Sequence, residues 1–226
     1  MSFFQYGDQE ITYLKLKDDR LAKAIEEIGH IDRVVNPDLF ESLVHAIIGQ
    51  QISTKAQETI WQRFVDAYGH VTPQGLLDTT PEQIQSLGIS NRKVSYILGA
   101  AEKVISGDLD LQALTQKSDQ QVLQELVALN GVGTWTAEML MIFSMQRPNI
   151  FSFGDLALHK GLQLLHGHEK IDKKTFLLYH KRYSPYASIA SFYLWAIAGG
   201  AIPSLKDEYK RKGNHLLNCQ VAADKS

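Results

Sequence analysis

Along this chain, apolar residues recur at the three- and four-residue spacing of an amphipathic helix, and no segment alternates convincingly at the spacing of a strand. In NPDLFESLVHAIIGQQ the apolar side chains fall on one face, and Asn36 followed by Pro37 is typical of a helix start. Similar segments follow one another. We expect helices within residues 10–28, 36–51, 53–69, 80–88, 90–107, 118–131, 155–167, 172–184 and 185–200, and another helix directly after Gly133.

Capping residues support these boundaries, because polar residues favour helix N-termini and glycines favour the positions just past the C-termini. The expected caps are Ser53 with Gly69, Thr80 with Gly88, Ser90 with Gly107, and Ser118 with Gln121 in a capping box. No internal repeat of 20 to 50 residues is present. The pattern therefore predicts an all-α protein with short loops. A chain of 226 residues suffices for one large domain or for two small lobes around a shared cleft, and we expect two helical lobes, 36–150 and 1–35 plus 151–226.

The turn Gly131-Val132-Gly133 joins two of the predicted helices. Glycine permits positive φ at a bend, and it leaves backbone N–H groups unshielded at the start of the next helix. We expect Val132 to point inward and hold the two helices together. Such a turn can bind a phosphate through its backbone alone. Helix–helix corners also often contain glycine, so the turn by itself leaves a purely structural role open.

The amino-acid composition limits the classes of protein to which this chain can belong. Hydrophobic residues make up 44% and charged residues 21%, which is typical of a folded globular protein. The single cysteine, Cys219, excludes a disulfide framework and a four-cysteine metal or iron–sulfur site. No apolar run reaches the length of a membrane span, and MSFFQYGDQE does not resemble a secretory signal, so we expect a cytoplasmic protein.

The net charge of −2 conceals an asymmetry. Residues 155–226 hold 11 Lys and Arg against 6 Asp and Glu, whereas residues 1–154 hold 12 against 19. A basic half suits binding to phosphate, although chance clustering on solvated faces explains it equally well.

The stretch LNGVG followed by Thr136-Ala137 resembles the helix-hairpin-helix motif of the HhH-GPD superfamily of DNA glycosylases. The superfamily also has an aspartate beyond the hairpin, which corresponds to Asp155 in FSFGDLALHKG. The resemblance implies a DNA-binding cleft between the lobes, phosphate contacts from Gly131, Val132, Gly133 and Thr134, and Asp155 as the catalytic residue. Asn130 stands where the family usually has proline.

Further motifs are similar to those of the alkylation-repair branch, the 3-methyladenine DNA glycosylase II type. Relatives that also cut the DNA strand have a lysine nucleophile at the position of Trp135, which cannot form an imine. In LVHAIIGQQISTKAQETI, the resemblance places Gln51 at a loop tip that enters the duplex. In RYSPYASIASFYLWAI, it places Tyr186 in the wall of the base pocket, and Ala187 stands where the family usually has arginine.

The resemblance implies a monofunctional glycosylase that flips alkylated, cationic purines such as 3-methyladenine or 7-methylguanine out of duplex DNA. Gln51 would fill the gap, and Trp135 with Tyr186 would attract the cationic base. Asp155 would stabilise the oxocarbenium-like sugar and assist a water molecule. The leaving base is already cationic, so no strong general acid is needed. We expect no cofactor, no metal and no obligate protein partner, and we expect a monomer.

Each of these residues also has a purely structural interpretation. Asp155 is well placed to cap a helix, Gln51 to face solvent, and Trp135 and Tyr186 to pack in a core. We expect Phe151, Phe153 and Trp195 to lie in the core and His166 and His168 to be solvated. His159 should form a surface pair with Asp155. The basic run of Lys206, Lys210, Arg211 and Lys212 should lie at a solvated helix end or contact a DNA backbone.

Three alternatives to the alkylbase glycosylase remain open at this point. They are a non-catalytic helix-hairpin-helix DNA-binding protein, a helical interaction domain, and a glycosylase for 8-oxoguanine or uracil. The preferred lesion, among 3-methyladenine, 7-methylguanine, hypoxanthine and etheno adducts, is not fixed by the sequence.

Overall fold

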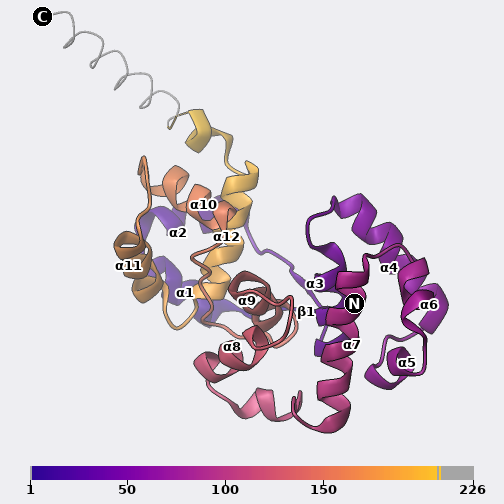
Figure 1. Cartoon of the computed structure of the whole chain (residues 1–226). Helices are drawn as coiled ribbons and strands as arrows, with labels where there is room; N and C mark the ends of the chain where they lie inside the picture. The colour runs from indigo at the N-terminus through magenta and orange to yellow at the C-terminus, as the bar shows by residue number, and fades with distance from the viewer. Residues whose placement is uncertain (1, 208, 210–226) are drawn as a thin grey trace, which may run out of the picture. The chain divides into compact units, whose positions relative to one another are not determined.

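The computed structural model describes residues 2–207 and 209, and these are mainly helical, which confirms the predicted all-α class (Figure 1). The chain divides into two compact units. The first comprises Val34–Arg147 with the start of the chain, and the second comprises Phe4–Arg33 with the part from Pro148 onward. No described helix is long and apolar enough to cross a membrane.

The first unit begins with a short antiparallel pair of strands, β1 (Ser2–Phe3) and β2 (Val34–Val35). Its helices follow in chain order: α3 (Leu39–Gly49), α4 (Thr54–Tyr68), α5 (Pro73–Leu77), α6 (Pro81–Ser86), α7 (Asn91–Ser106), the 3₁₀ helix η1 (Ala113–Gln116), α8 (Asp119–Val127) and α9 (Thr134–Phe143).

Helix α3 supplies the centre of this unit's core. Its apolar face is almost completely buried, as the spacing predicts, and consists of Phe40, Leu43, Val44, Ile47 and Ile48. Helices α4, α7 and α9 all pack against α3, and α8 packs against α9. The elements that flank the glycine turn are therefore attached to a rigid core.

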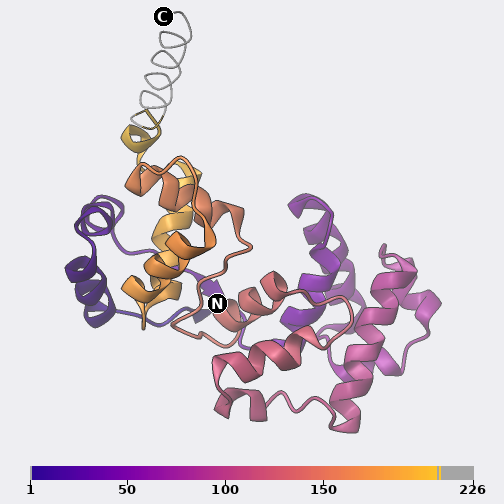
Figure 2. The same ribbon diagram turned by 60° about the vertical axis from the view of Figure 1, so that its left-hand side comes forward.

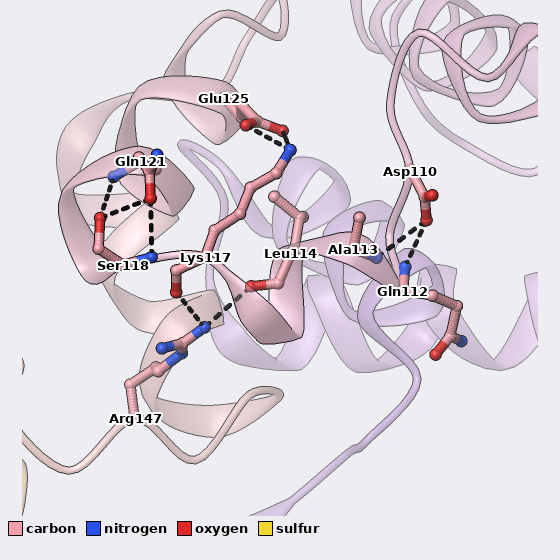
Figure 3. Close-up of polar contacts among 9 residues, drawn as sticks. All are labelled: Asp110, Gln112, Ala113, Leu114, Lys117, Ser118, Gln121, Glu125 and Arg147. Atoms are coloured by element: carbon pink, nitrogen blue, oxygen red, sulfur yellow. Dashed lines mark hydrogen bonds and ion pairs between the residues drawn. The ribbon is translucent and has the colours of Figure 1, made fainter.

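Arg147, just past α9, ties the hairpin helices together at their far end (Figure 3). Its guanidinium donates to the carbonyl oxygens of Leu114 and Lys117, each at 2.9 Å. Beside it, Lys117 pairs with Glu125 of α8 at 2.6 Å. The N-terminus of α8 carries the predicted capping box of Ser118. Because these contacts fix the start of α8 to the end of α9, the turn between the two helices is held at both sides.

The second unit contains α1 (Asp8–Lys17), α2 (Asp19–Ile28), α10 (Leu156–His166), α11 (Lys173–Tyr183) and α12 (Ala187–Gly199). Residues 187–194 of α12 are all buried, which is typical of a helix surrounded by others. Figure 2 shows the α10 and α12 ribbons beside each other, and these two helices form the unit's most extensive packing contact.

Four local predictions were wrong or incomplete. The cap of α3 is Asp38 rather than Asn36, because the Asn36 side chain accepts the Asp38 N–H at 3.0 Å and turns the chain before the helix starts. The expected helix over 10–28 is broken at Asp18, whose carboxylate caps α2. The strand pair was missed because each strand has two residues, and the short elements α5 and η1 were also missed.

Candidate functional site

The glycine turn between α8 and α9 needs glycine at its first position. Gly131 has a φ of +83°, and a Cβ built there would lie 2.2 Å from the Tyr96 ring of α7. Val132 is 6% exposed and points into the core, as predicted. The turn therefore packs directly against the side of α7.

Gly133 serves a different purpose at the start of α9. Its φ is −87°, and no atom lies within 4 Å of the position of a Cβ. No side chain caps this helix end, and Gly133, Thr134 and Trp135 are exposed. Unshielded amides at a helix N-terminus carry partial positive charge and suit an anion such as phosphate.

Trp135 is 49% exposed, so the interpretation of this residue as core packing is wrong. It lines a cavity of about 1190 Å³ that lies within the first unit, between α3, α4 and α9. The hairpin glycines Gly131 and Gly133 border the same cavity. Trp135 and the glycine turn therefore open onto one space.

The cavity contains residues that sequence reasoning missed. His45 of α3 and Trp61 of α4 lie edge to face, with ring centroids 4.9 Å apart. Burial lowers the pKa of His45 below its ordinary value, although the Glu41 carboxylate opposes this shift. The only available signal was the spacing of Glu41, His45 and Gly49, which places them on one face of α3.

Electrostatically, the cavity is suited to a cation. Among the described residues that line it, Glu41 is the only one with a formal charge once His45 is neutral. Met139, Leu140 and Phe143 of α9 supply an apolar wall next to Trp135.

Gln51 and its neighbour Gln50 differ in conformation and contacts. Gln51 is exposed in the loop between α3 and α4 and has a φ of +58°, which is uncommon for a residue with a side chain. The Gln50 side chain instead donates to the carbonyl oxygen of Gly131 at 2.7 Å. The sequence motif did not indicate this contact.

Asp155 is the N-cap of α10, and its carboxylate accepts the N–H of Leu158 at 2.8 Å. Asp155 is largely buried, with an exposed fraction of 7%. The predicted capping role is thus confirmed, and it holds the carboxylate in one orientation. The Nε2 of His159 lies 2.8 Å from the backbone oxygen of Phe153, in the loop before α10.

Tyr186 directly precedes α12 and is partly buried. Its ring packs edge to face with Tyr13, at a centroid distance of 5.2 Å, and its hydroxyl accepts from the Gln9 amide at 3.1 Å. The next residue, Ala187, is fully buried.

Two structural predictions need correction. His166 is not solvated, because it lies beside the buried Asp18 carboxylate at 3.4 Å and the Tyr183 hydroxyl at 3.2 Å. Phe153 is 42% exposed rather than in the core, since it stands in the loop before α10. Within residues 2–207 and 209, no group of three or more side chains is arranged to hold a metal ion. Of the basic run after residue 205, Lys210, Arg211 and Lys212 lie outside the described residues.

An all-α chain with a glycine hairpin, an uncapped helix start and an aspartate that caps a later helix has the features of a helix-hairpin-helix DNA repair protein. Residues 44–184 match the family described as HhH-GPD superfamily base excision DNA repair protein. The match spans more than half of the chain, so the chain belongs to this superfamily.

Named relatives agree with this assignment. DNA-3-methyladenine glycosylase 1 of Schizosaccharomyces pombe is 32% identical over 78% of this chain and 79% of its own length. A solved DNA-3-methyladenine glycosidase from Bacillus halodurans is 37% identical, with a TM-score of 0.80 over 88% of this chain and 93% of that chain. The S. pombe 3-methyladenine DNA glycosylase Mag1, solved in complex with abasic DNA, is 28% identical, with a TM-score of 0.71 over 84% and 96%.

Proposed function

We propose that this protein is a monofunctional DNA glycosylase that excises cationic alkylated purines, such as 3-methyladenine and 7-methylguanine, from duplex DNA in base excision repair. The observation that carries the proposal is the cavity in the first unit, which combines the half-exposed Trp135 with a lining whose single formal charge, among described residues, is the negative Glu41. The similarity to DNA-3-methyladenine glycosylases supports the same conclusion.

The cavity favours a cationic base over a neutral one for two reasons. The face of an indole ring attracts a cation by about 0.5–2 kcal/mol, and more when water is excluded. A lining without Lys or Arg side chains, among described residues, does not repel the cation. Trp135 also lacks the amine needed to form an imine with the sugar, so the reaction stops at removal of the base.

We assign the remaining roles as follows. The amides of Gly133, Thr134 and Trp135 bind a DNA phosphate. Gln51 enters the space left by the flipped nucleotide, which offsets part of the cost of unstacking, about a few kcal/mol.

Asp155 stabilises positive charge on the sugar as the base departs, and it orients or deprotonates the attacking water. Its capping bond to Leu158 fixes the orientation of the carboxylate before substrate binds. Tyr186 is proposed as a second aromatic contact for the base. The monomeric state and the cytoplasmic location stay predictions.

The test is release of free methylated purines from alkylated duplex DNA by the wild type and by Asp155→Asn. Asparagine caps helices about as well as aspartate, so α10 should remain intact while the negative charge is lost. The matched control is Asp172→Asn, because Asp172 caps α11 in the same way and accepts the Thr175 N–H at 2.7 Å.

We expect Asp155→Asn to lose most of the activity while keeping its melting temperature and its DNA affinity, and Asp172→Asn to keep all three. Equal release by Asp155→Asn and the wild type would remove Asp155 from the chemistry. DNA binding without release by any of the proteins would leave a non-catalytic DNA-binding module.

A further inference from the structure

The loop between α3 and α4, residues 50–53, is held by contacts to Gln50 from two sides, and the end of α3 just before it is contacted from a third. Its tip carries Gln51, the residue assigned to fill the gap in the duplex. The contacts come from α7, from the glycine hairpin and from α4, and all of them lie within the first unit.

Lys93 of α7 makes the first of these contacts. Its ammonium group donates to the carbonyl oxygens of Ile48 and Gln50, each at 2.8 Å. These oxygens belong to the C-terminal end of α3, where the helix dipole is negative and carbonyl groups lack helical partners. Lys93 itself is the third residue of α7, where that helix's own dipole disfavours a cation. The position of this lysine is therefore explained by α3 rather than by α7.

Gln50 makes the second contact, because its side-chain amide donates to the carbonyl oxygen of Gly131 at 2.7 Å. This bond joins residues 81 positions apart in the sequence. One turn further along α7, Tyr96 packs against Gly131. The same side of α7 thus touches both the loop of Gln51 and the hairpin that we assign to phosphate binding.

Helix α4 makes the third contact. The Gln57 amide donates to the carbonyl oxygen of His45 at 3.0 Å and lies so close to Gly49 that a Cβ there would be 2.3 Å away. Gly49 is the last residue of α3. The end of α3 is therefore packed against α4 directly before the loop, and Gln51 at the loop tip has an uncommon positive φ.

We propose that Lys93 and Gln50 are positioning residues that hold the Gln51 loop at a fixed distance from the phosphate-binding hairpin. A duplex anchored by its phosphate at the hairpin then meets the tip of the loop at one defined step of the helix. Without the two contacts, the hairpin still binds DNA, but the loop moves independently and stabilises the flipped nucleotide less well. This inference rests on the proposed function.

The experiment compares the wild type with Lys93→Met and Gln50→Leu, with Lys103→Met as the matched control. Lys103 is an exposed lysine near the far end of α7, so its replacement removes the same charge from the same helix. Three quantities are measured below the melting temperature of every protein. They are the affinity for undamaged duplex, the fluorescence of a 2-aminopurine next to a 7-methylguanine, and the single-turnover rate of base release at saturating protein.

We expect Lys93→Met and Gln50→Leu to slow base release by at least about tenfold, which corresponds to about 1.4 kcal/mol. The rise in 2-aminopurine fluorescence should fall with the rate, whereas the affinity for undamaged DNA should change by less than about threefold, since the backbone amides that hold the phosphate are unaffected. Lys103→Met should match the wild type in all three quantities.

A double variant separates positioning from general destabilisation. If Lys93 acts through the loop tip, Lys93→Met combined with Gln51→Ala should be no slower than Gln51→Ala alone, because contacts that act as one unit are not additive. Additive losses, wild-type release by Lys93→Met, or an equal loss of affinity for undamaged DNA would each overturn the inference. Failure of the wild type to release any base would instead refute the proposed function, and the fluorescence comparison would still test the positioning role.

Discussion

Replacement by alanine should have different effects at the two glycines of the hairpin, because it lowers stability at Gly131 and DNA affinity at Gly133. At Gly131 a side chain meets two obstacles. A φ of +83° costs a residue with a Cβ about 1–2 kcal/mol, and insertion of a methyl group into a packed site costs about 1–3 kcal/mol more. The second cost arises because the new Cβ would lie 2.2 Å from the Tyr96 ring. Gly131→Ala should therefore lower the free energy of unfolding by about 2–5 kcal/mol.

Gly133 has neither obstacle, because its φ is negative and no atom lies within 4 Å of a built Cβ. Gly133→Ala should lower the free energy of unfolding by no more than about 1 kcal/mol, because alanine is a poorer N-cap than glycine but meets no steric obstacle here. The methyl group would nevertheless stand at the exposed start of α9, where we place the phosphate. The affinity of Gly133→Ala for DNA should therefore fall at temperatures where the variant is still fully folded.

Urea denaturation followed by circular dichroism measures the first effect, and a fluorescence anisotropy titration with duplex DNA measures the second. Combining Gly131→Ala with Tyr96→Ala distinguishes the two costs, because the smaller side chain removes the overlap and leaves the backbone strain. An unchanged unfolding curve for Gly131→Ala would refute the argument from φ and packing. Unchanged DNA affinity for a folded Gly133→Ala would refute the phosphate site at α9.

Three further predictions concern the cavity and the buried His166, which lies beside Asp18 and Tyr183. Trp135→Ala should slow release of 7-methylguanine between about twofold and thirtyfold, the equivalent of about 0.5–2 kcal/mol, with little change in melting temperature; an unchanged rate would exclude a contact with the base. Glu41→Gln should lower the ratio of kcat/KM for 7-methylguanine over that for neutral hypoxanthine, and an unchanged ratio would contradict the charge argument. Burial outweighs the attraction of Asp18 and lowers the pKa of His166 from 6.5 to about 4. The unfolded chain therefore binds a proton more readily than the folded chain, and stability should fall between pH 6.5 and pH 4 by up to about 3 kcal/mol. Denaturation of His166→Gln should show a weaker dependence on pH over this range.

Much of the secondary structure was predictable because its signals are local. Ser53, Ser90 and Ser118 each cap the helix that they precede, with side chains that reach only three residues ahead. The cap at Asp18 was not predictable in the same way, since the apolar period continues across it from α1 into α2. Asn36 was a comparable case, because Asn36 and Asp38 are both good caps and only the fold decides between them.

The site was predictable only where one short motif carries it. The hairpin and Asp155 each lie within a continuous stretch, and the resemblance to the superfamily indicated both. The bond from Gln50 to Gly131 and the contact between His45 and Trp61 join segments that are distant in sequence. No spacing rule distinguishes Gln50 from Gln51 either. The two differ only in backbone conformation and in what their side chains reach.

The electrostatics of the first unit suggest why the phosphate site uses backbone amides. The hairpin glycines border the same cavity as Trp135, so the groups that attract an anionic phosphate lie next to the space that we assign to a cationic base. A lysine or arginine here would carry a full charge that acts over about 10 Å at moderate salt and would repel the base. The start of a helix carries about half a charge, and its effect falls off within the first turn. Lys93, meanwhile, directs its ammonium group at the carbonyl oxygens of Ile48 and Gln50 at the end of α3, whose partial negative charge offsets part of its own. Backbone amides thus provide enough positive potential to bind a phosphate without placing a full positive charge beside the base.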